Sequence, residues 1–435
     1  MRQISLFIKK QPPGRLIAVG FALVILLGTL LLLLPVSVRE DASVSFIDAL
    51  FTSTSAVCVT GLIAIDVADH FTIFGQAVVA ILIQVGGLGV TSIGAGLILA
   101  ARKRLGMKGR VLVKEALNVD GAKGMVRLVK SVLLMTLCFE VVGAALSFVV
   151  FSQDYATGDA VRLSLFHSIA AFNNSGFDIL GGLRNLIPYQ GDVLLNLTTA
   201  GLIIFGGIGF LVILDVGKKR FNFKKFTFHT KVVLTTTLFL LVAGTLLLKA
   251  TEDVTWLGAF FQSVSARTAG FSTYPIGEFT DAGLFTLILL MFVGASPGST
   301  GGGIKTTTFF VLIQEVRSLF TKRHIGAFRR SISMETLGKA FLITLLSLLL
   351  VCAGTFLLCI LEPDLTFLQL LFEEVSAFGT VGLSTGITPG LGWPAKLVLI
   401  ITMFAGRVGM FTLLSMWIDR LAPAARYTEE SLTVG

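Results

Sequence analysis

Long apolar segments constrain this chain more than any other feature of its sequence. A helix needs about 20 apolar residues to cross the hydrocarbon core of a bilayer. Segments that satisfy this requirement occur eight times, at 16–36, 73–101, 131–151, 193–214, 232–250, 283–313, 340–361 and 396–418. Only 14% of the residues are charged, whereas a soluble domain has about 25%. The sequence therefore predicts an all-α integral membrane protein with eight transmembrane helices.

Two of these segments, 73–101 and 283–313, are longer than one crossing and rich in glycine. We expect them to tilt or to break inside the membrane. The four cysteines, at positions 58, 138, 352 and 359, form no CxxC pair, and the four histidines are scattered. The sequence therefore predicts neither a disulfide framework nor a metal cluster.

Basic residues alternate between the two sides of the membrane. Most of the 35 Lys and Arg residues fall at the N-terminus, in 102–130, 216–231 and 315–339, and in the C-terminal tail. The positive-inside rule then places both termini in the cytoplasm. This bias explains the net charge of +9, and because the basic loops are short and adjoin apolar segments, we expect no nucleic-acid binding. The stretch from Lys108 to Lys130 predicts a cytoplasmic surface helix that could dock a partner.

One phrase recurs four times, each time in an outer connection between apolar segments. It reads FTSTSAVCVTGL (51–62), FHSIAAFNNSGF (166–177), FQSVSARTAGF (261–271) and FEEVSAFGTVGL (372–383). Each copy begins with Phe, continues with Ser or Ala and then Ala, and ends with Gly before Leu or Phe. The uneven spacing of the copies excludes a solenoid. The repeating unit is segment–phrase–segment, which divides the chain into 1–110, 111–218, 219–330 and 331–435.

The length of the phrase decides its physical interpretation. About ten semi-apolar residues precede each Gly, which is too short to cross, so the chain can enter as a half-helix and return extended. Four such hairpins around one axis would form a pore. The helix C-termini would favour a cation, and backbone carbonyls turned inward at Gly would replace its water shell. The alternative, outer loops with incidental glycines, does not explain the repeated lead-in.

The motifs VTGL, FNNSGF, RTAGF and GTVGL together resemble the Trk/Ktr/HKT superfamily of potassium transporters, over about residues 14–420. The eight-segment length is most similar to the Ktr-type membrane subunit. The resemblance implies four non-identical pore-loop repeats around one central pore, as in potassium channels, and potassium uptake across the cytoplasmic (inner) membrane. It also implies a homodimer, control by a cytosolic nucleotide-binding (KtrA-like) ring, K⁺ as substrate, Na⁺ as a possible activator, and no catalytic cofactor.

The resemblance transfers the filter glycines of the family to Gly61, Gly176, Gly270 and Gly382, and glycine at the first of these positions favours potassium over sodium. The candidate ion-binding residues are Cys58, Val59, Thr60, Gly61, Asn173, Asn174, Ser175, Gly176, Thr268, Ala269, Gly270, Gly379, Thr380, Val381 and Gly382. The third phrase is one residue short, so which of Arg267, Thr268 and Ala269 lines the pore stays open. A single Gly per strand predicts few carbonyl layers and looser selectivity.

The sixth apolar segment contains GASPGSTGGGIKTTT (294–308), whose proline and five glycines cannot sustain a helix. Gly298 and Gly303 have the spacing of a phosphate-binding P-loop, but Ile304 separates them from Lys305, which argues against nucleotide binding. A structural kink is an alternative. The resemblance implies a gate loop, with candidate residues Gly294, Ala295, Ser296, Pro297, Gly298, Ser299, Thr300, Gly301, Gly302, Gly303, Lys305 and Arg407.

Arg407 lies 14 residues after Trp393, about 21 Å along a helix. A charge at that depth must face protein or water, so we expect Arg407 to bind the loop or to repel cations. Pairing with a carboxylate, or extension of the side chain to the interface, is the alternative. Lys305 is closer to the cytoplasm and could reach the interface.

Other acidic residues have simpler interpretations. Asp66 and Asp178 follow the first two phrases, where they could enrich cations or lie in solvated loops. We expect Glu373 and Glu374 to begin the fourth half-helix, and Glu140 to form an interhelical hydrogen bond.

Two alternative functions stay open on the sequence. A sodium-permeable or sodium-coupled transporter of the same superfamily differs only in selectivity. A membrane-embedded enzyme would need acids, His or Cys converging at one depth, which the sequence does not offer. No ATPase site is visible, so ions would follow the electrochemical gradient or be coupled to another ion, and the sequence does not distinguish a channel from a coupled transporter.

Overall fold

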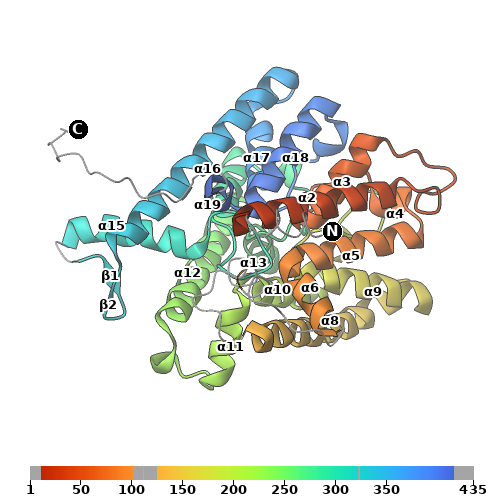
Figure 1. Ribbon diagram of the computed structural model, residues 1–435. Helices are drawn as coiled ribbons and strands as arrows, with labels where there is room; N and C mark the ends of the chain where they lie inside the picture. The colour runs from red at the N-terminus through yellow and green to blue at the C-terminus, as the bar shows by residue number, and fades with distance from the viewer. Residues whose placement is uncertain (1–10, 101–110, 112–124, 322–323, 416–435) are drawn as a thin grey trace.

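The computed structural model describes residues 11–100, 111, 125–321 and 324–415, whose regular secondary structure is almost entirely helical (Figure 1). The predicted surface helix at 108–130 lies largely outside these residues, and its last six positions belong to a long helix that begins at Met125. A two-stranded hairpin, β1 (Gly326–Ala327) and β2 (Arg330–Ser331), is the strand structure in the described part.

The helices form four units of the same design, each with a long helix, a short helix and a broken helix. Unit one contains α2 (Pro13–Leu32), α3 (Phe46–Cys58), α5 (Ile73–Leu88) and α6 (Val90–Ala100), with α4 (Val67–His70) between them. Unit two contains α8 (Met125–Asp154), α9 (Thr157–Phe172), α10 (Val193–Gly207) and α11 (Phe210–Lys218). Unit three contains α12 (Phe228–Thr251), α13 (Trp256–Ser265), α14 (Asp281–Phe292) and α15 (Thr306–Thr321). Unit four contains α16 (Met334–Leu361), α17 (Phe367–Gly379), α18 (Trp393–Val408) and α19 (Met410–Ser415).

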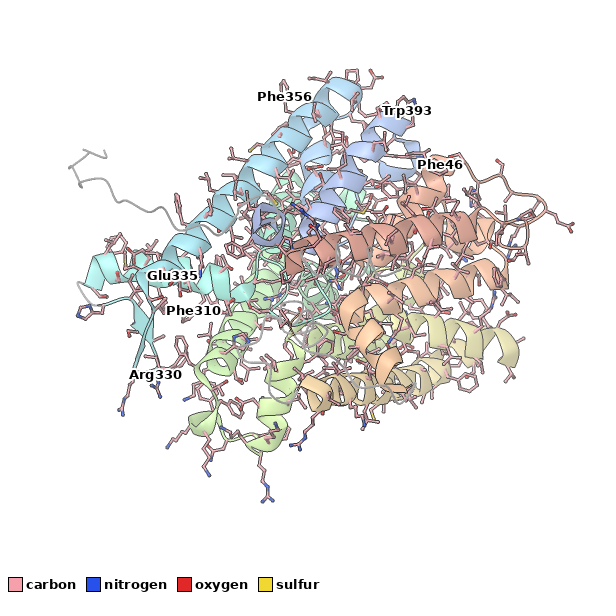
Figure 2. All side chains as sticks on the ribbon, in the orientation of Figure 1. Phe46, Phe310, Arg330, Glu335, Phe356 and Trp393 are labelled. Atoms are coloured by element: carbon pink, nitrogen blue, oxygen red, sulfur yellow. The ribbon has the colours of Figure 1, made fainter. Side chains whose placement is uncertain are left out.

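The long helix of each unit is able to cross a membrane by length and composition: Pro13–Leu32, Val126–Asp154, Phe228–Thr251 and Met334–Leu361. Their outer faces carry many exposed apolar side chains, as do the tips of the neighbouring helices. Figure 2 shows Phe356 and Trp393 pointing away from the protein body, and each is 66% exposed. Large apolar side chains in such positions suit contact with lipid. The molecule is an integral membrane protein.

The second apolar segment of every unit is interrupted. The breaks predicted in 73–101 and 283–313 are confirmed, at Gly89 and at residues 293–305. Breaks that the sequence did not lead us to expect also occur in 193–214 and 396–418, where α10 and α11 meet at a bend of 96° and α18 ends before Gly409. Gly89, Gly209 and Gly409 have φ angles of +82°, +93° and +89°, which other residues adopt at a cost, so the helix stops there.

A repeated contact positions the short helices. In unit one a Cβ on Gly28 would overlap Ser53, so α2 and α3 approach closely, and Ser53 Oγ donates to Ile25 O at 2.7 Å. The same pairing recurs in units two and three, between Gly143 and Ser168 and between Gly244 and Ser263. In unit four Gly354 faces Glu374 instead. The long helix of each unit thus fixes the depth and direction of its short helix.

Polar contacts also join successive units near the starts of their helices. Lys396 on α18 and Asp48 on α3 form an ion pair at 2.8 Å, with side chains only 10% and 17% exposed. Arg162 on α9 donates to Gln76 on α5 at 2.8 Å. The first contact connects unit four to unit one, and the second connects unit one to unit two.

Candidate functional site

The four short helices end at a common centre, where the chain that follows each helix meets the next copy. At each of the four repeated glycines, an added Cβ would lie closer than 3.0 Å to a carbonyl oxygen of the neighbouring strand. The pairs are Gly61 with Ser175, Gly176 with Ala269, Gly270 with Val381, and Gly382 with Thr60. The series returns to its starting strand, so these four strands form a closed ring, which we call the ring.

Each ring strand has the same backbone conformation. A residue with positive φ stands two positions before the glycine, which itself has positive φ: Val59, Asn174, Thr268 and Thr380 have φ of +57°, +57°, +72° and +49°. The residue between them donates its N–H to the carbonyl of the repeated Ser or Ala, at 2.8 to 2.9 Å. This pattern aligns Thr268 and Ala269 with the other strands, so the residue missing from the third phrase precedes Thr268.

The serine at the repeated Ser/Ala position braces the strand. Ser55 Oγ accepts from Gly61 N at 3.0 Å and donates to Leu62 O at 2.8 Å. Ser376 Oγ accepts from Gly382 N at 3.0 Å, and Ser265 Oγ donates to Phe271 O. These bonds hold three strands against their own helices, at the glycine or at the residue after it, and explain the recurrence of serine in the phrase.

Three of the predicted filter residues lie at helix ends rather than in extended chain. Cys58 and Gly379 are the last residues of α3 and α17, and Asn173 caps α9. The Asn173 amide donates to Gln84 Oε1 at 2.8 Å and to Glu140 Oε1 at 3.1 Å. The predicted interhelical hydrogen bond of Glu140 is therefore confirmed, and Asn173 supports its strand from behind.

Residues 293–305 form a loop that lies directly against one end of the ring. Its two ends pair with each other, with Gly294 N donating to Ile304 O at 2.8 Å. A Cβ on Gly301 would overlap the Thr268 side chain. Gly302 N donates to Thr380 Oγ1 at 3.0 Å, and Thr300 Oγ1 and the Asn174 amide are 3.3 Å apart. The loop therefore contacts the second, third and fourth ring strands.

The same loop fills the break between α10 and α11. Ser296 N donates to Gly207 O at 3.0 Å, and Thr300 N donates to Gly206 O at 3.2 Å. Phe210 N donates to Gly298 O at 2.9 Å. The carbonyls that α10 leaves unpaired at its end are thus satisfied by the loop, which explains why the helix can stop here.

Two half-buried cations bind the loop. Lys305 Nζ donates to Gly301 O at 2.8 Å and to Gly302 O at 3.4 Å, so the prediction that Lys305 reaches the interface is wrong. Arg407 donates to Thr300 O and Gly86 O, and to Gly87 O at 3.3 Å. In the described chain these partners are all backbone carbonyls, so Arg407 binds the loop rather than pairing with a carboxylate.

A cavity of about 450 Å³ adjoins the loop. It is lined by loop residues, by Lys305 and Arg407, and by the chain around Gly89 and Gly409. Because the second halves of the broken helices surround it, the cavity lies beyond the loop from the ring. The loop thus separates the ring from a space large enough for several water molecules.

Two acids that follow ring strands are buried, each 7% exposed. Asp66 accepts from Leu183 N at 2.7 Å, and Asp178 accepts from Leu180 N at 2.9 Å. The interpretation as solvated loop residues is wrong, because both carboxylates order the chain beside the ring. Burial raises the pKa of Asp178 to about 7, with repulsion from Asp66 and Asp69 adding to the effect.

Glu373 and Glu374 lie in the middle of α17, so the expectation that they begin this helix is wrong. The helix begins at Phe367, after a capping box in which Thr366 and Gln369 exchange hydrogen bonds. That TxxQ pattern in the sequence could have identified the start. Glu373 instead accepts from Thr385 N at 2.8 Å and from Thr388 Oγ1 at 2.7 Å, which fixes the chain that follows the fourth ring strand.

Comparison with known proteins agrees with this geometry. The family model TrkH, described as a cation transport protein, matches residues 16–424. This chain belongs to the TrkH family of cation transport proteins. It is 39% identical over 437 residues to the Ktr system potassium uptake protein B of Bacillus subtilis, with 97% of each chain covered. It is 37% identical to the potassium/sodium uptake protein NtpJ of Enterococcus hirae, with 98% of each covered.

A solved structure also resembles this TrkH-family chain. The crystal structure of the potassium transporter TrkH from Vibrio parahaemolyticus matches with a TM-score of 0.70 at 20% identity. The match covers 93% of this chain and 85% of that one. It shows a shared helical membrane fold.

A second set of repeated glycines in this TrkH-family chain was missed at the sequence level. Gly86, Gly206 and Gly406 each lie against a carbonyl near the end of a short helix, those of Val57, Phe172 and Phe378, where a Cβ would overlap the oxygen. The signal is present as GGLGV, GGIGF and GRVGM. Each pattern contains the glycine that contacts the short helix and, three positions later, the glycine at which the second helix of the unit is interrupted. Arg407 occupies the second position of the third pattern.

The described residues contain no group of three or more His, Cys, Asp or Glu side chains that could hold a metal ion. The chemistry available at the ring is therefore that of backbone carbonyls and of the hydroxyls and amides beside them.

Proposed function

We propose that this chain is the ion-translocating subunit of a Ktr-type potassium uptake system, and that the ring is its selectivity filter. The closed contact series of the four glycines carries the proposal, because it brings four backbone segments to one axis. The names of the relatives support potassium as the ion. Residues 58–61, 173–176, 268–270 and 379–382 are the proposed filter segments.

The geometry suits a dehydrated cation. The helices α3, α9, α13 and α17 all end at the ring, so their partially negative C-termini point toward the centre. The carbonyls of Thr60, Ser175, Ala269 and Val381 lie beside the neighbouring glycines, where they can replace water molecules around the ion. The short strands offer few layers of carbonyls, so we expect weaker discrimination than in a filter with many layers.

The loop of residues 294–303, with Lys305 and Arg407, is the proposed gate. It lies between the ring and the 450 Å³ cavity, so an ion that leaves the ring must displace it. Lys305 and Arg407 bind loop carbonyls and place two positive charges beside the path. Both effects oppose cation passage while the loop keeps this position.

The proposed architecture has four pore-loop repeats, each with one long transmembrane helix, a re-entrant short helix with its ring strand, and a broken second transmembrane helix. The breaks at equivalent glycines in units one, two and four support this repeat. The distribution of basic residues supports cytoplasmic termini in the cytoplasmic membrane. A homodimer and a cytosolic nucleotide-binding ring are the proposed partners, because the relatives named Ktr system proteins are components of transport systems.

Complementation of a potassium-uptake-deficient bacterium at low potassium tests the proposal. The chain is expressed with its cognate regulator, and its presence in the membrane is verified. We expect growth at low potassium. Absence of rescue by membrane-inserted protein would refute potassium uptake.

Isotope uptake separates the second candidate, a sodium-permeable or sodium-coupled transporter, which the printed name of the Enterococcus hirae relative favours. Uptake of potassium that sodium does not inhibit would support the first proposal. Equal uptake of both ions would support the second.

A further inference from the structure

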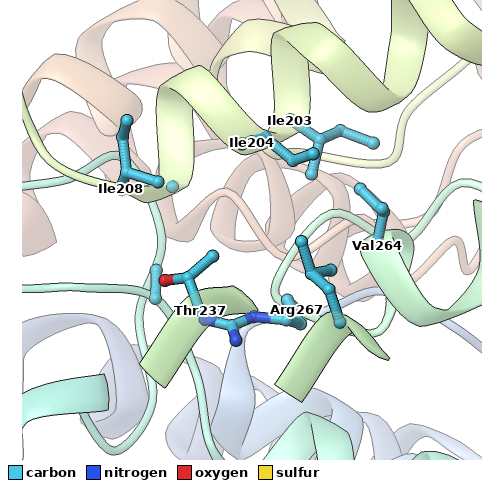
Figure 3. A pocket seen from close by; sticks show the side chains of 9 residues that line it. Ile203, Ile204, Ile208, Thr237, Val264 and Arg267 are labelled. Carbon is cyan, nitrogen blue, oxygen red and sulfur yellow. The ribbon is translucent and has the colours of Figure 1, made fainter. Parts of the chain in front are cut away.

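Arg267 is a buried cation next to the ring whose side chain takes no part in it. It directly precedes Thr268, the first residue of the third ring strand, and is 7% exposed. Figure 3 shows its side chain in a small pocket beside Thr237 and Val264, with Ile203 and Ile204 above. The pocket lies between α10, α12 and α13. The side chain therefore leaves the ring and enters the helical packing around it.

The guanidinium is only partly satisfied by the residues described. Its Nη2 donates to Gly294 O at 3.4 Å, and no described carboxylate pairs with it. Its Nη1 has no partner among the described residues, and neither has the hydroxyl of Thr237 in the same pocket. A buried guanidinium is costly unless its N–H groups find acceptors. Conformations in which Arg267 loses the Gly294 carbonyl are therefore unfavourable.

The acceptor that Arg267 contacts lies at the start of the loop. Helix α14 ends at Phe292, and Gly294 is the second residue after it. Gly294 N donates to Ile304 O at 2.8 Å, and Ala295 N donates to Gly302 O at 3.3 Å. Arg267 therefore holds the residue at which the two ends of the loop pair with each other.

The pocket has room for a water molecule that would be a second acceptor for Arg267. Its volume is about 20 Å³, which is enough for one water molecule and for little else. A water in it would have Arg267 Nη1 as donor and the Thr237 hydroxyl as a further partner. The isoleucines that line the rest of the pocket exclude competing polar groups.

We propose that Arg267 is a positioning residue that ties the start of the 293–305 loop to the third ring strand, with one water joining its Nη1 to Thr237. Movement of the loop would remove the Gly294 carbonyl from a buried cation and is therefore opposed. Arg407 holds the middle of the loop from the cavity side, and Arg267 holds Gly294, near the start of the loop, from the ring side. The consequence for ion flow rests on the proposed gate, whereas the tether itself does not.

Hydrogen-exchange mass spectrometry of the full-length protein tests the tether directly. The variants are Arg267→Met, Arg267→Lys and Thr237→Val, with Thr236→Val as the matched control. Thr236 is also buried on α12 with an unpartnered hydroxyl among the described residues, but it does not line the pocket. The readout is the exchange rate of peptides that cover residues 293–305.

We expect Arg267→Met to raise exchange in the loop about tenfold, because it removes a charged hydrogen bond. Arg267→Lys keeps the charge but cannot reach both acceptors, so the increase should be smaller. Thr237→Val should raise exchange in the wild-type background and add nothing to Arg267→Met. Thr236→Val should match the wild type. Unchanged exchange in folded Arg267→Met would overturn the proposal.

Two further arms keep the outcome decisive. If Arg267→Met does not fold, wild-type exchange in both Arg267→Lys and Thr237→Val would refute the tether. If the protein transports potassium, Arg267→Met should change the maximal rate and leave KM for potassium unchanged. A raised KM at an unchanged rate would assign Arg267 to the filter instead. If no transport is found, the proposed function fails while the exchange data still decide the tether.

Discussion

Substitution of Gly176 by serine tests whether the ring binds the ion. Gly176 has φ of +69°, and a Cβ there would lie 2.8 Å from Ala269 O and 3.0 Å from Gly270 Cα. A residue with a Cβ loses about 1–2 kcal/mol in this conformation, and overpacking adds about 1–3 kcal/mol. The combined strain of about 2–5 kcal/mol falls on two adjacent ring strands. If the surrounding helices do not relax, this strain should make the free energy of ion binding less favourable by a similar amount.

We expect Gly176→Ser to weaken potassium binding by about 30-fold or more, because each 1.4 kcal/mol changes affinity tenfold. Potassium raises the unfolding temperature of a protein that binds it in the folded state, so the titration of this shift reports affinity without transport. The KM for potassium uptake and its inhibition by sodium provide a second measurement. The control is Gly201→Ser on α10, where a Cβ would meet nothing within 4 Å.

The reasoning has a definite point of failure. If Gly176→Ser keeps both the wild-type potassium titration and the wild-type preference over sodium, the ring is not the filter. If Gly201→Ser loses affinity to the same extent, the loss reports general damage rather than a filter defect.

Three other predictions follow from described contacts. Arg407→Met removes the charged hydrogen bond from Arg407 to Thr300 O in the loop, which is worth about 1.5–3 kcal/mol, so uptake without the cytosolic partner should rise about tenfold. The control is Lys339→Met, because Lys339 also lines the cavity but pairs with Glu335; this variant should leave uptake unchanged. Equal uptake rates in the wild type, Arg407→Met and Lys339→Met would contradict the proposed gate. Lys396→Met leaves the half-buried Asp48 carboxylate without its ion pair and should destabilise the protein by about 1.5–3 kcal/mol, the worth of a charged hydrogen bond. Thermal unfolding should show partial recovery in Lys396→Met with Asp48→Leu. A wild-type unfolding temperature in Lys396→Met alone would exclude a stabilising role for the pair. Asp178 has a folded pKa of about 7 against the ordinary 3.8, so the folded state retains a proton that the unfolded chain releases, and stability should fall as pH rises from 4 to 7 and then level off. Asp178→Asn should reduce the slope of stability against pH. An unaltered profile in this variant would refute the assignment of the slope to Asp178.

The sequence predicted the short helices and the four glycines because their requirements are local. An apolar stretch too short to cross the membrane, followed by a glycine where the chain turns back, predicts a short helix and its ring strand without knowledge of the neighbouring segments. The alignment of the third strand could not be predicted in this way. One residue is missing there, and either the helix end or the strand could absorb the loss. The hydrogen bond from Ala269 to Ser265 decides it, and this bond exists only in the folded backbone.

The breaks at Gly209 and Gly409 were missed for a different reason. One glycine in an apolar run is compatible with a continuous helix at a cost of about 1 kcal/mol. At Gly209 the loop favours the broken helix over the continuous one, because the Gly298 carbonyl accepts a hydrogen bond from Phe210 N. The partners of Arg407 were equally out of reach, because Gly86 and Thr300 are far away in the sequence. Its depth predicted that it needs partners inside the protein but not which residues they are.

The proposed filter is built from one polypeptide, and this has a consequence for how its ion preference can change. In a channel of four identical subunits, every substitution appears at four places at once, so most alterations of the pore are severe. Here one codon changes a single quadrant while the other three keep their shape. The third quadrant, with its missing residue and its arginine, shows that such departures from fourfold symmetry are tolerated. With the ring as the proposed filter, selection can therefore adjust ion preference in small, asymmetric steps.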